Sequence, residues 1–289
     1  MSNLIIGCGY LGQRVGARLC QSGERVFGTV RSAGRASEIA RLGIEPVLAE
    51  VLEPESLKSL PAANRLFYSV GFDRTAGSSM QSVHVDGLQN VLDRLTSETI
   101  RFVYASSTGV YGQIDGEWVD EESPASPTHE SGRICLEAEG RVRAWAEARG
   151  GAASAIVLRF AGLYGPERVV RRAIVERGEP IPGDPAKFLN LIHIEDAARA
   201  AVAALQTARG EPLYLVADDR PVTRREYYSS IARLLGAPEP RFELPRPGSA
   251  EAQRDATNKR ISNRRMRSLL GVELLHQDIA SGLPSALAD

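Results

Sequence analysis

Three glycines near the start of the chain have the spacing of a phosphate-binding turn. Gly7, Gly9 and Gly12 stand in the order G-x-G-x-x-G within LIIGCGYLGQ. The run follows a strand-like apolar segment and opens a helix-like one, the context in which free backbone N–H groups can bind a pyrophosphate. One glycine permits the tight turn, one lets the ligand approach the backbone, and one lets helix and strand pack closely. The spacing indicates a dinucleotide site; the alternative is an ordinary strand-to-helix turn.

The residues after the second strand-like segment bear on which dinucleotide is bound. In TVRSAGR, Arg31 and Ser32 follow Val30, and no acidic residue stands between Glu24 and Glu38. An Asp or Glu at this strand end would bind ribose hydroxyls and repel a 2′-phosphate. A guanidinium instead binds a phosphate through two parallel hydrogen bonds. The pattern predicts NADP; the alternative is that Arg31 is a solvated surface residue.

Composition and charge exclude several classes of function. The 289 residues are 43% hydrophobic and 25% charged, as in a globular protein. The net charge of −1 gives no electrostatic footprint for nucleic acid or a membrane surface. Cys8, Cys20 and Cys135 lack metal-ligand spacing and argue against a disulfide scaffold, so no metal site is predicted. No signal peptide or membrane span is visible, and a cytoplasmic location is the default expectation.

The elements that must position these residues alternate along the chain. The strand-like segments LIIGCG, RVFGTV, EPVLAEV, NRLFYSVG and IRFVYASS are each followed by a helix-like stretch. This alternation predicts an α/β fold, a Rossmann-type doubly wound parallel sheet with a small C-terminal substrate lobe. After about residue 166 the pattern loosens. We expect an NADP-binding Rossmann domain at 1–165 and 187–217, and a small substrate-binding lobe at 166–186 and 218–289.

Five ordered motifs resemble those of a known group of proteins. They are GCGYLG, VYASSTGVYG, RFAGLYGP, LIHIEDAARA and NKRISNRRMRSLLGVELL. Together they resemble the short-chain dehydrogenase/reductase superfamily, and in particular its extended branch, the NAD(P)-dependent epimerase/dehydratase group. The resemblance spans nearly the whole chain. It implies a Rossmann domain with a small C-terminal lobe, and substrates such as nucleotide sugars or related carbonyl and hydroxyl compounds.

The resemblance also implies roles for individual positions. Those that match the family's cofactor-binding segments are Gly7, Gly9, Tyr10, Leu11 and Gly12 in the pyrophosphate loop, Arg31 and Ser32 at the 2′-phosphate, Glu50 near the adenine, and Tyr68, Ser69 and Val70 along the cofactor. Ser107, four residues before Tyr111, matches the catalytic Ser/Thr. His84 stands where the branch often has Asn. His193 and Asp196 match the H-x-x-D segment, whose role is mainly structural.

The proton-transfer pair of the superfamily is absent from this sequence. That pair is a Tyr with a Lys four residues later, on one helix face; the Tyr exchanges a proton with the substrate oxygen, and the Lys lowers the pKa of the Tyr. None of the eight tyrosines has a Lys four residues on. Matching the chain to the family through Glu137 puts His129 at the Tyr position and Arg133 at the Lys position.

Several side chains remain candidates for this chemistry. Arg133 could bind ribose hydroxyls and His129 could move a proton near neutral pH, or His129 could be a loop residue without a role. Tyr111 and Tyr164 follow strand ends, where ligands bind in such sheets, or they could be packing residues. The arginines that could receive a phosphorylated substrate, or simply be solvated, are Arg168, Arg171, Arg172, Arg264, Arg265 and Arg267.

The sequence as a whole predicts an NADP-dependent oxidoreductase or epimerase-like protein that acts on a carbonyl or hydroxyl substrate. Ser107 would polarise the substrate oxygen, and an unusual group would carry the proton. The alternative is a catalytically silent NADP-binding sensor or scaffold. The expected partner is a small molecule such as a nucleotide sugar, with no nucleic acid and no membrane, and a homodimer is the assembly we consider.

Overall fold

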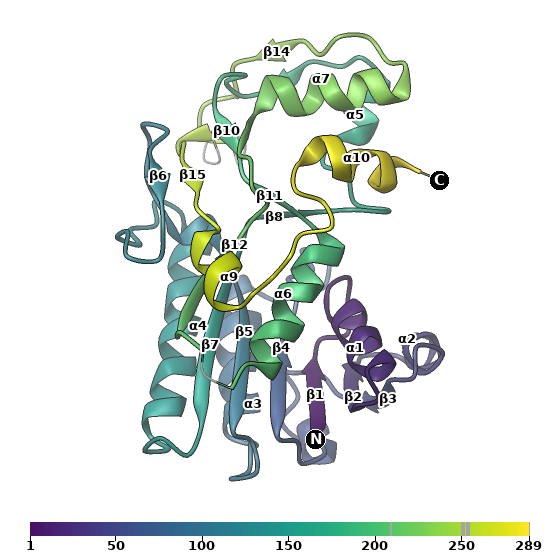
Figure 1. Cartoon of the computed structure of the whole chain (residues 1–289), viewed down its shortest axis with the longest axis vertical. Coiled ribbons are helices and arrows are strands. Elements are labelled where there is room, and N and C mark those ends of the chain that lie inside the picture. Colours follow the sequence, from purple (N-terminus) through teal and green to yellow (C-terminus); the bar gives the residue numbers. More distant parts are fainter. Residues whose placement is uncertain (209, 250–251, 253–254, 289) are drawn as a thin grey trace.

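Seven parallel strands form the central sheet within residues 1–208, 210–249, 252 and 255–288, the part of the chain that the computed structural model describes (Figure 1). The strands are β1 (Ser2–Ile6), β2 (Arg25–Val30), β3 (Glu45–Leu48), β4 (Arg65–Tyr68), β5 (Arg101–Ser107), β7 (Ser154–Phe160) and β12 (Leu213–Val216). Their order across the sheet is β12-β7-β5-β4-β1-β2-β3. Each neighbouring pair is parallel, so all seven carboxyl ends lie at one edge.

The direction of strand addition changes at β1. From β1 the chain proceeds through β2 to β3 on one side, and β4 then returns to pair with the other edge of β1. The loops that leave β1 and β4 therefore diverge and open a crevice at the carboxyl ends of these strands, which is where ligands bind in open α/β sheets. The glycine turn follows β1 directly and lies at this crevice.

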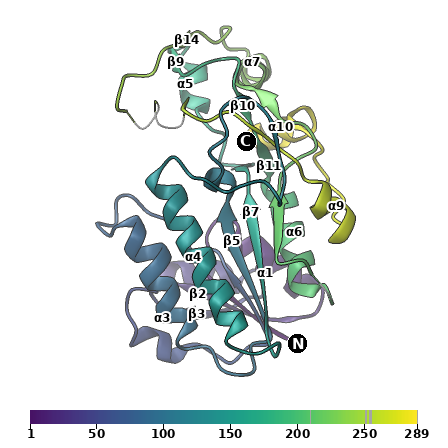
Figure 2. The ribbon, with the colours of Figure 1, turned by 90° about the vertical axis from the view of Figure 1, so that its left-hand side faces the viewer.

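Helices cover both faces of the sheet. Figure 2 shows α3 (Gly87–Leu92) and α4 (Glu130–Glu147) on one side and α6 (Ile194–Gln206) on the other. The helices α1 (Gly12–Gln21) and α2 (Ala33–Ala40) share the apolar core of α6. The predicted α/β fold with a Rossmann-type doubly wound sheet is thus confirmed.

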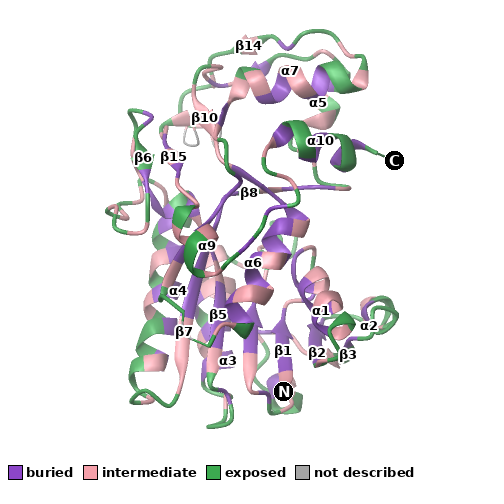
Figure 3. Ribbon diagram, in the orientation of Figure 1, coloured by how far each residue is buried: buried purple, intermediate pink, exposed green. Residues whose placement is uncertain are grey.

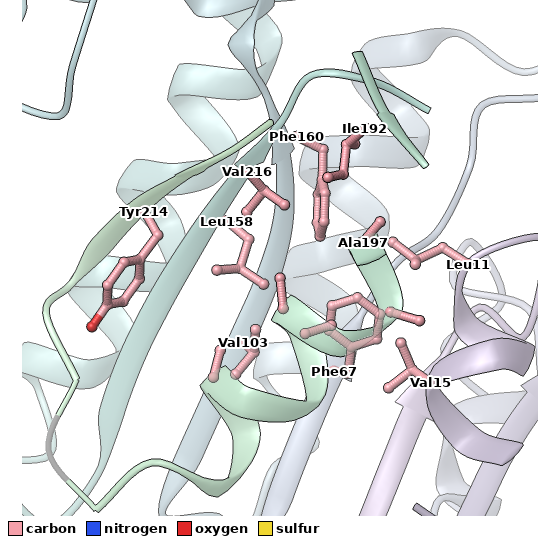
Figure 4. Close-up of a cluster of buried hydrophobic side chains, with 14 of the residues drawn as sticks. Leu11, Val15, Phe67, Val103, Leu158, Phe160, Ile192, Ala197, Tyr214 and Val216 are labelled. Atoms are coloured by element: carbon pink, nitrogen blue, oxygen red, sulfur yellow. The ribbon is translucent and has the colours of Figure 1, made fainter. Parts of the chain in front are cut away.

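Alternation of side chains along the strands builds one core on each face. Phe67 and Val103 point to the face of α1 and α6, and Figure 4 shows them among the side chains of that core. Phe102 and Tyr104, which flank Val103 along β5, point to the face of α3 and α4. Full burial of each such side chain contributes about 1.5–3 kcal/mol. These two cores hold the strand ends in the positions from which the site is built.

Figure 3 shows exposed residues along α4, whereas the strands of the central sheet are mostly buried. The longest helix, α4, has exposed Arg and Glu residues along its outer side. Among the described residues, no helix is both long enough and apolar enough to cross a membrane.

A second group of elements lies beyond the carboxyl ends of the strands (Figure 1). It contains the strand pairs β8 (Gly162–Tyr164) with β11 (Leu191–His193), β9 (Ile181–Pro182) with β14 (Phe242–Glu243), β10 (Phe188–Leu189) with β13 (Val222–Thr223) and β6 (Trp118–Val119) with β15 (Arg260–Ile261), and the helices α5 (Arg172–Glu176), α7 (Arg224–Leu235) and α10 (Ile279–Leu287). Tyr227, Ile231 and Leu283 belong to a separate apolar core of this group. Three short helical turns lie in the connections between the strands of the central sheet: η1 (Ser56–Ser59), the π-helical η2 (Ser82–Asp86) and η3 (Thr108–Val110).

The C-terminal segment crosses between the two groups of elements. The helix α9 (Arg264–Leu269) packs against β12, and Met266, Val272 and Leu274 join the core beneath α1 and α6. Part of the range 218–289 therefore packs on the sheet and not in the lobe. The division into 1–165 with 187–217 and 166–186 with 218–289 stays a prediction.

Candidate functional site

The glycine turn after β1 has the shape that a pyrophosphate needs. Gly7 has φ +91°, and a Cβ there would lie 2.9 Å from the carbonyl oxygen of Ser69. A Cβ at Gly12 would collide with the carbonyl of Gly7, so α1 can start this close only without one. A Cβ at Gly9, by contrast, would meet no described atom within 4 Å. The second glycine thus faces open space, as the approach of a ligand to the backbone requires.

A cleft of about 800 Å³ opens beyond this turn. Its size is within the range of small-molecule and cofactor pockets, about 300–1,000 Å³. Predicted cofactor residues that line it are Gly7, Gly9, Arg31, Ser32, Glu50, Ser69 and Val70. Other predicted residues are placed around it: Gly12 permits the turn, Leu11 and Tyr68 are buried in the two cores, and the Tyr10 hydroxyl donates to the Pro166 carbonyl at 2.9 Å.

Basic groups gather at the end of the cleft that β2 provides. The side chain of Arg31 is 60% exposed, with Glu50 at 3.6 Å and Asp73 at 3.8 Å. These carboxylates lie beyond hydrogen-bond distance, and such exposed pairs contribute only about 0–1 kcal/mol. Ser32 caps α2 by accepting from the backbone N–H of Arg35. The donors of Arg31 therefore remain available to an anionic ligand.

Sequence reasoning missed Arg35, which also lines this end of the cleft. Its guanidinium donates to the carbonyl of Cys8 and to the side chain of Gln13, both at 3.3 Å, and pairs with Glu38. These contacts hold a second cation beside the glycine turn. Arg35 could have been found from the sequence, because it stands three positions after the N-cap Ser32. A residue at that position lies one turn into the helix and therefore close to the same end of the cleft as Ser32.

Ser107 and the start of α4 are brought together by a close contact between two backbones. Ser107 ends β5, and its Oγ accepts from the N–H of Gly109 at 3.0 Å, which caps η3. A Cβ at Gly132 would lie 2.6 Å from the carbonyl oxygen of Gly109. The absence of a side chain at Gly132 thus lets the first turn of α4, with His129 and Arg133, pack on the turn that Ser107 begins.

His129 is the N-cap residue of α4 and is half-buried. Burial lowers its pKa, and the positive charges of Lys259 and Arg133 lower it further. An imidazole with a pKa below the usual 6.5 is neutral at pH 7. His129 can therefore accept a proton at neutral pH but is a poor donor of one.

Tyr111 is fully buried in a hydrogen-bonded network below the turn. Its hydroxyl donates to the carbonyl of Asp120 at 3.0 Å and accepts from Arg159 at 2.7 Å. Arg159 also pairs with the buried Glu139, which accepts a hydrogen bond from Ser106 at 2.6 Å. Burial raises the pKa of Tyr111. Its hydroxyl already uses its hydrogen-bond donor and accepts a hydrogen bond from an arginine. This argues against Tyr111 as a proton donor to a substrate and favours the packing alternative.

Tyr164 is likewise enclosed. Its ring packs edge-on against His193 at 5.2 Å, and its hydroxyl donates to the carbonyl of Asp278 at 3.4 Å. Gly282 of α10 packs so closely on the phenol that a Cβ there would collide with it. Burial raises the pKa of Tyr164 far above the usual value. The structure therefore places Tyr164 in the joint between sheet and lobe, away from the cleft, which again favours packing.

The H-x-x-D segment serves structure, as the resemblance implies. The side chain of His193 accepts from the N–H of Glu195 and caps α6. Asp196 is fully buried and accepts from the backbone N–H groups of Leu275 and His276 at 2.7 and 2.9 Å, which fixes the C-terminal segment on α6. In the described part of the chain, no group of three or more His, Cys, Asp or Glu residues could hold a metal ion.

Several of the other candidate positions make contacts within the protein. Arg265 pairs with Glu122 at 2.6 Å and Arg267 with Asp219 at 3.0 Å, so both already have carboxylate partners. Arg168 lies over the ring of Tyr10, with its guanidinium carbon 5.4 Å from the ring centroid. His84 belongs to the π-helical turn η2, where burial lowers its pKa.

Known proteins resemble this chain over most of its length. Protein YeeZ of Escherichia coli K12 is 31% identical over 246 residues, which cover 82% of this chain and 85% of that protein. A 3-diazoavenalumate denitrifying reductase from a Streptomyces species is 27% identical and covers 98% of this chain and 99% of that protein. The UDP-glucose 4-epimerase of Thermus thermophilus, solved with NAD, superposes with a TM-score of 0.78 over 99% of this chain and 97% of that one. At 20% identity, this last likeness shows the fold alone.

A family model for NAD dependent epimerases and dehydratases matches residues 4–217. The match includes the glycine turn, Ser107, the first turn of α4 and the H-x-x-D segment. The expected resemblance to the extended short-chain dehydrogenase/reductase branch is thereby confirmed. The chain belongs to the NAD dependent epimerase/dehydratase family.

Proposed function

We propose that the protein is an NADP-dependent oxidoreductase that acts on a carbonyl or hydroxyl group of a small molecule. The observation that carries the proposal is the cleft after β1 and β2. Its glycine turn leaves room for a pyrophosphate at Gly9, and its far end carries Arg31 and Arg35 with no acidic residue at the end of β2. When bound, the nicotinamide cofactor would supply or accept the hydride.

The position of Ser107 at a strand end supports a role for it in the proposed reaction. It ends a central strand and caps the turn η3, on which Gly132 of α4 packs, and its hydroxyl accepts the backbone N–H of Gly109. We infer that this O–H donates to the reacting oxygen of the substrate. Arg133, which is exposed on the first turn of α4, would bind the ribose hydroxyls.

Nucleotide sugars are the substrate class that we propose to test first. The support is the family membership, together with the Thermus epimerase, whose name gives UDP-glucose as its substrate. The Streptomyces relative is a reductase, which supports hydride transfer as the wider reaction class. A cytoplasmic location and a homodimer stay predictions.

Cofactor preference is tested by binding. Wild type should bind NADPH at least tenfold more tightly than NADH. Arg31→Ala removes a charge-assisted hydrogen bond to the 2′-phosphate, which costs about 1.5–3 kcal/mol, or about ten- to a hundredfold in affinity for NADPH but not for NADH. Isothermal titration measures both constants. The exposed Arg233 on α7 provides a matched control, because Arg233→Ala removes a guanidinium far from the cleft. Equal affinity of wild type for the two cofactors would contradict NADP preference.

A catalytically silent NADP-binding protein is the second candidate function. It is favoured by the missing Tyr-x-x-x-Lys pair and by the enclosure of Tyr111 and Tyr164. Oxidation of NADPH in the presence of a panel of UDP-sugars, aldehydes and ketones separates the two candidates. Turnover with any panel member supports the oxidoreductase. Tight and different binding of NADPH and NADP⁺ without turnover supports the sensor.

A further inference from the structure

A lysine from the C-terminal segment reaches the loop that follows Ser107. Lys259 immediately precedes β15, which pairs in parallel with β6. The side-chain amide of Asn190 fixes this segment, since it donates to the carbonyl of Lys259 at 2.9 Å and accepts from the N–H of Ile261 at 2.7 Å. The backbone that carries Lys259 is therefore held from both sides.

The ammonium group of Lys259 is buried against the loop that follows Ser107. Its Nζ donates to the carbonyl of Tyr111 at 2.8 Å, and the residue is only 9% exposed. A Cβ at Gly112 would collide with the carbonyl of Ser126, so the segment that leads to His129 lies against the same loop. One loop thus brings the Ser107 turn, His129 and Lys259 to the same place in the fold.

The ammonium has donors to spare. A lysine has three N–H donors, and among the described residues one acceptor, the Tyr111 carbonyl, lies within hydrogen-bond distance of Nζ. An ammonium this deeply buried is costly unless its remaining donors bind something. The charged group that acts on the Lys259 ammonium is the carboxylate of the exposed Glu117 before β6. On the side of α4, the charge of Lys259 itself lowers the pKa of His129, as the charge of Arg133 does.

The charge state of Lys259 also suits proton transfer. Burial lowers its pKa to about 8, and the charge of Glu117 opposes the shift. The group is therefore mostly protonated at pH 7 and gives up a proton far more readily than an exposed lysine. His129 is neutral at this pH, and the hydroxyls of Tyr111 and Tyr164 are enclosed, so neither type of group competes as a donor.

We propose that Lys259 gives the proton to the reacting oxygen of the substrate, in the place of the absent Tyr-x-x-x-Lys pair. The inference rests on the proposed function. As NADPH is oxidised to NADP⁺, the carbonyl carbon gains the hydride and the carbonyl oxygen gains a proton from the Lys259 ammonium, with Ser107 donating a hydrogen bond to that oxygen. One N–H bond breaks and one O–H bond forms. The neutral amine then regains a proton from water.

Lysine NMR tests the location of the group without a substrate. The chain has only Lys58, Lys187 and Lys259, so protein labelled with ¹³C at lysine Cε gives three signals, which single Lys→Arg variants assign. Titration with pH at saturating NADPH and at saturating NADP⁺ should give a pKa for Lys259 that is lower with NADP⁺ by about half a unit or more. The reason is the positive charge that the oxidised nicotinamide ring brings close to it. The exposed Lys58 is the internal control and should not shift.

Two outcomes would overturn the inference, and they are distinguishable. If calorimetry shows that both cofactors bind and the pKa of Lys259 is the same in the two complexes, Lys259 does not lie near the nicotinamide ring. The proposed function would then still stand. Failure of both cofactors to bind removes the proposed function, and this inference with it.

Kinetics test the role itself. Lys259→Arg keeps a donor to the Tyr111 carbonyl and a positive charge, but does not titrate. With any substrate that wild type reduces, it should bind NADPH normally, lose about 10²–10⁴-fold in kcat, and lose the fall in rate near pH 8 that deprotonation of the lysine causes. Lys58→Arg should match wild type. If Lys259→Arg has the same turnover and pH profile as wild type, Lys259 is not the proton donor. If wild type itself turns over no substrate, the proposed reaction is excluded, and the role of Lys259 with it.

Discussion

Single side chains decide what the cleft can bind and where the chemistry can take place. Gly7 and Gly12 are required by close contacts of the backbone, whereas a Cβ at Gly9 would meet no described atom within 4 Å, which leaves space for a ligand. Arg31 and Arg35 supply the charge at one end. On β5, two adjacent serines have different functions, because their side chains point to opposite faces of the sheet. Ser106 bonds to the buried Glu139, and Ser107 begins the turn at the strand end.

The two serines allow a matched test of catalysis against stability. Ser107→Ala should lower kcat by about 10²-fold, the loss expected for one hydrogen-bond donor to the transition state, and leave NADPH affinity nearly unchanged. Ser106→Ala leaves Glu139 without one hydrogen bond and should lower the free energy of unfolding by about 1–3 kcal/mol with little effect on kcat. Steady-state kinetics and denaturant unfolding measure the two effects. Unchanged turnover in Ser107→Ala would remove that serine from the mechanism.

At the level of elements, the contact between α4 and η3 sets the geometry of the site. Figure 2 shows that α4 runs along one face of the sheet beside β5, and that the first turn of α4 lies at the carboxyl end of that strand. Gly132 permits this approach, since a Cβ there would lie 2.6 Å from both the Gly109 carbonyl and Pro127. The helix thus carries His129 and Arg133 to the end of the strand that carries Ser107.

Two glycines of α4 give opposite predictions for the same substitution. Gly132→Ala should push the first turn of α4 away from η3, lower the free energy of unfolding by about 1–3 kcal/mol and reduce turnover. Gly140→Ala meets no described atom within 4 Å and should raise the free energy of unfolding by about 0.5–1 kcal/mol, because alanine favours the helix. Urea unfolding with activity assays checks both. Equal effects of the two substitutions would show that the α4–η3 contact is not tight.

In the molecule as a whole, the joint between sheet and lobe holds buried ionisable groups. Asp218 follows β12 and is 2% exposed. Burial raises its pKa to about 8, with the charges of Asp278 and Asp219 acting in the same direction and a hydrogen bond from the N–H of Arg220 opposing it. The side chain of Asp278 accepts from Ser281 and caps α10, which packs on Tyr164. The joint therefore holds a carboxyl group that is neutral at pH 7.

This carboxyl group makes stability depend on pH. Its folded-state pKa of about 8 lies above its unfolded-state value of about 3.9, so its contribution to stability is complete below about pH 4 and is lost as pH rises toward 8. Asp218→Asn removes the titration and keeps the acceptor for Arg220. The melting temperature of Asp218→Asn minus that of wild type should therefore increase between pH 5 and pH 8, by several degrees on the order expected for a few kcal/mol. Calorimetry at both values measures it, and a pH-independent difference would contradict the neutral state.

Some of this protein is determined by short stretches of its sequence. The glycine spacing and the alternation of strand and helix depend on residues only a few positions apart, so the sequence was sufficient to predict them. The family resemblance and the absence of Tyr-x-x-x-Lys are likewise visible without coordinates. The reason is that turn geometry, helix periodicity and strand alternation are local properties of the chain.

Tertiary structure alone decided which distant residues meet. Lys259 lies beside Tyr111 although 148 residues separate them, and nothing in the spacing of NKRISN indicates that contact. The enclosure of Tyr111 by Arg159, and the packing of Met266 on the sheet, were also not predictable from local pattern. Such contacts depend on which apolar faces pack and which buried polar groups find partners, and these are settled only when the whole chain has folded.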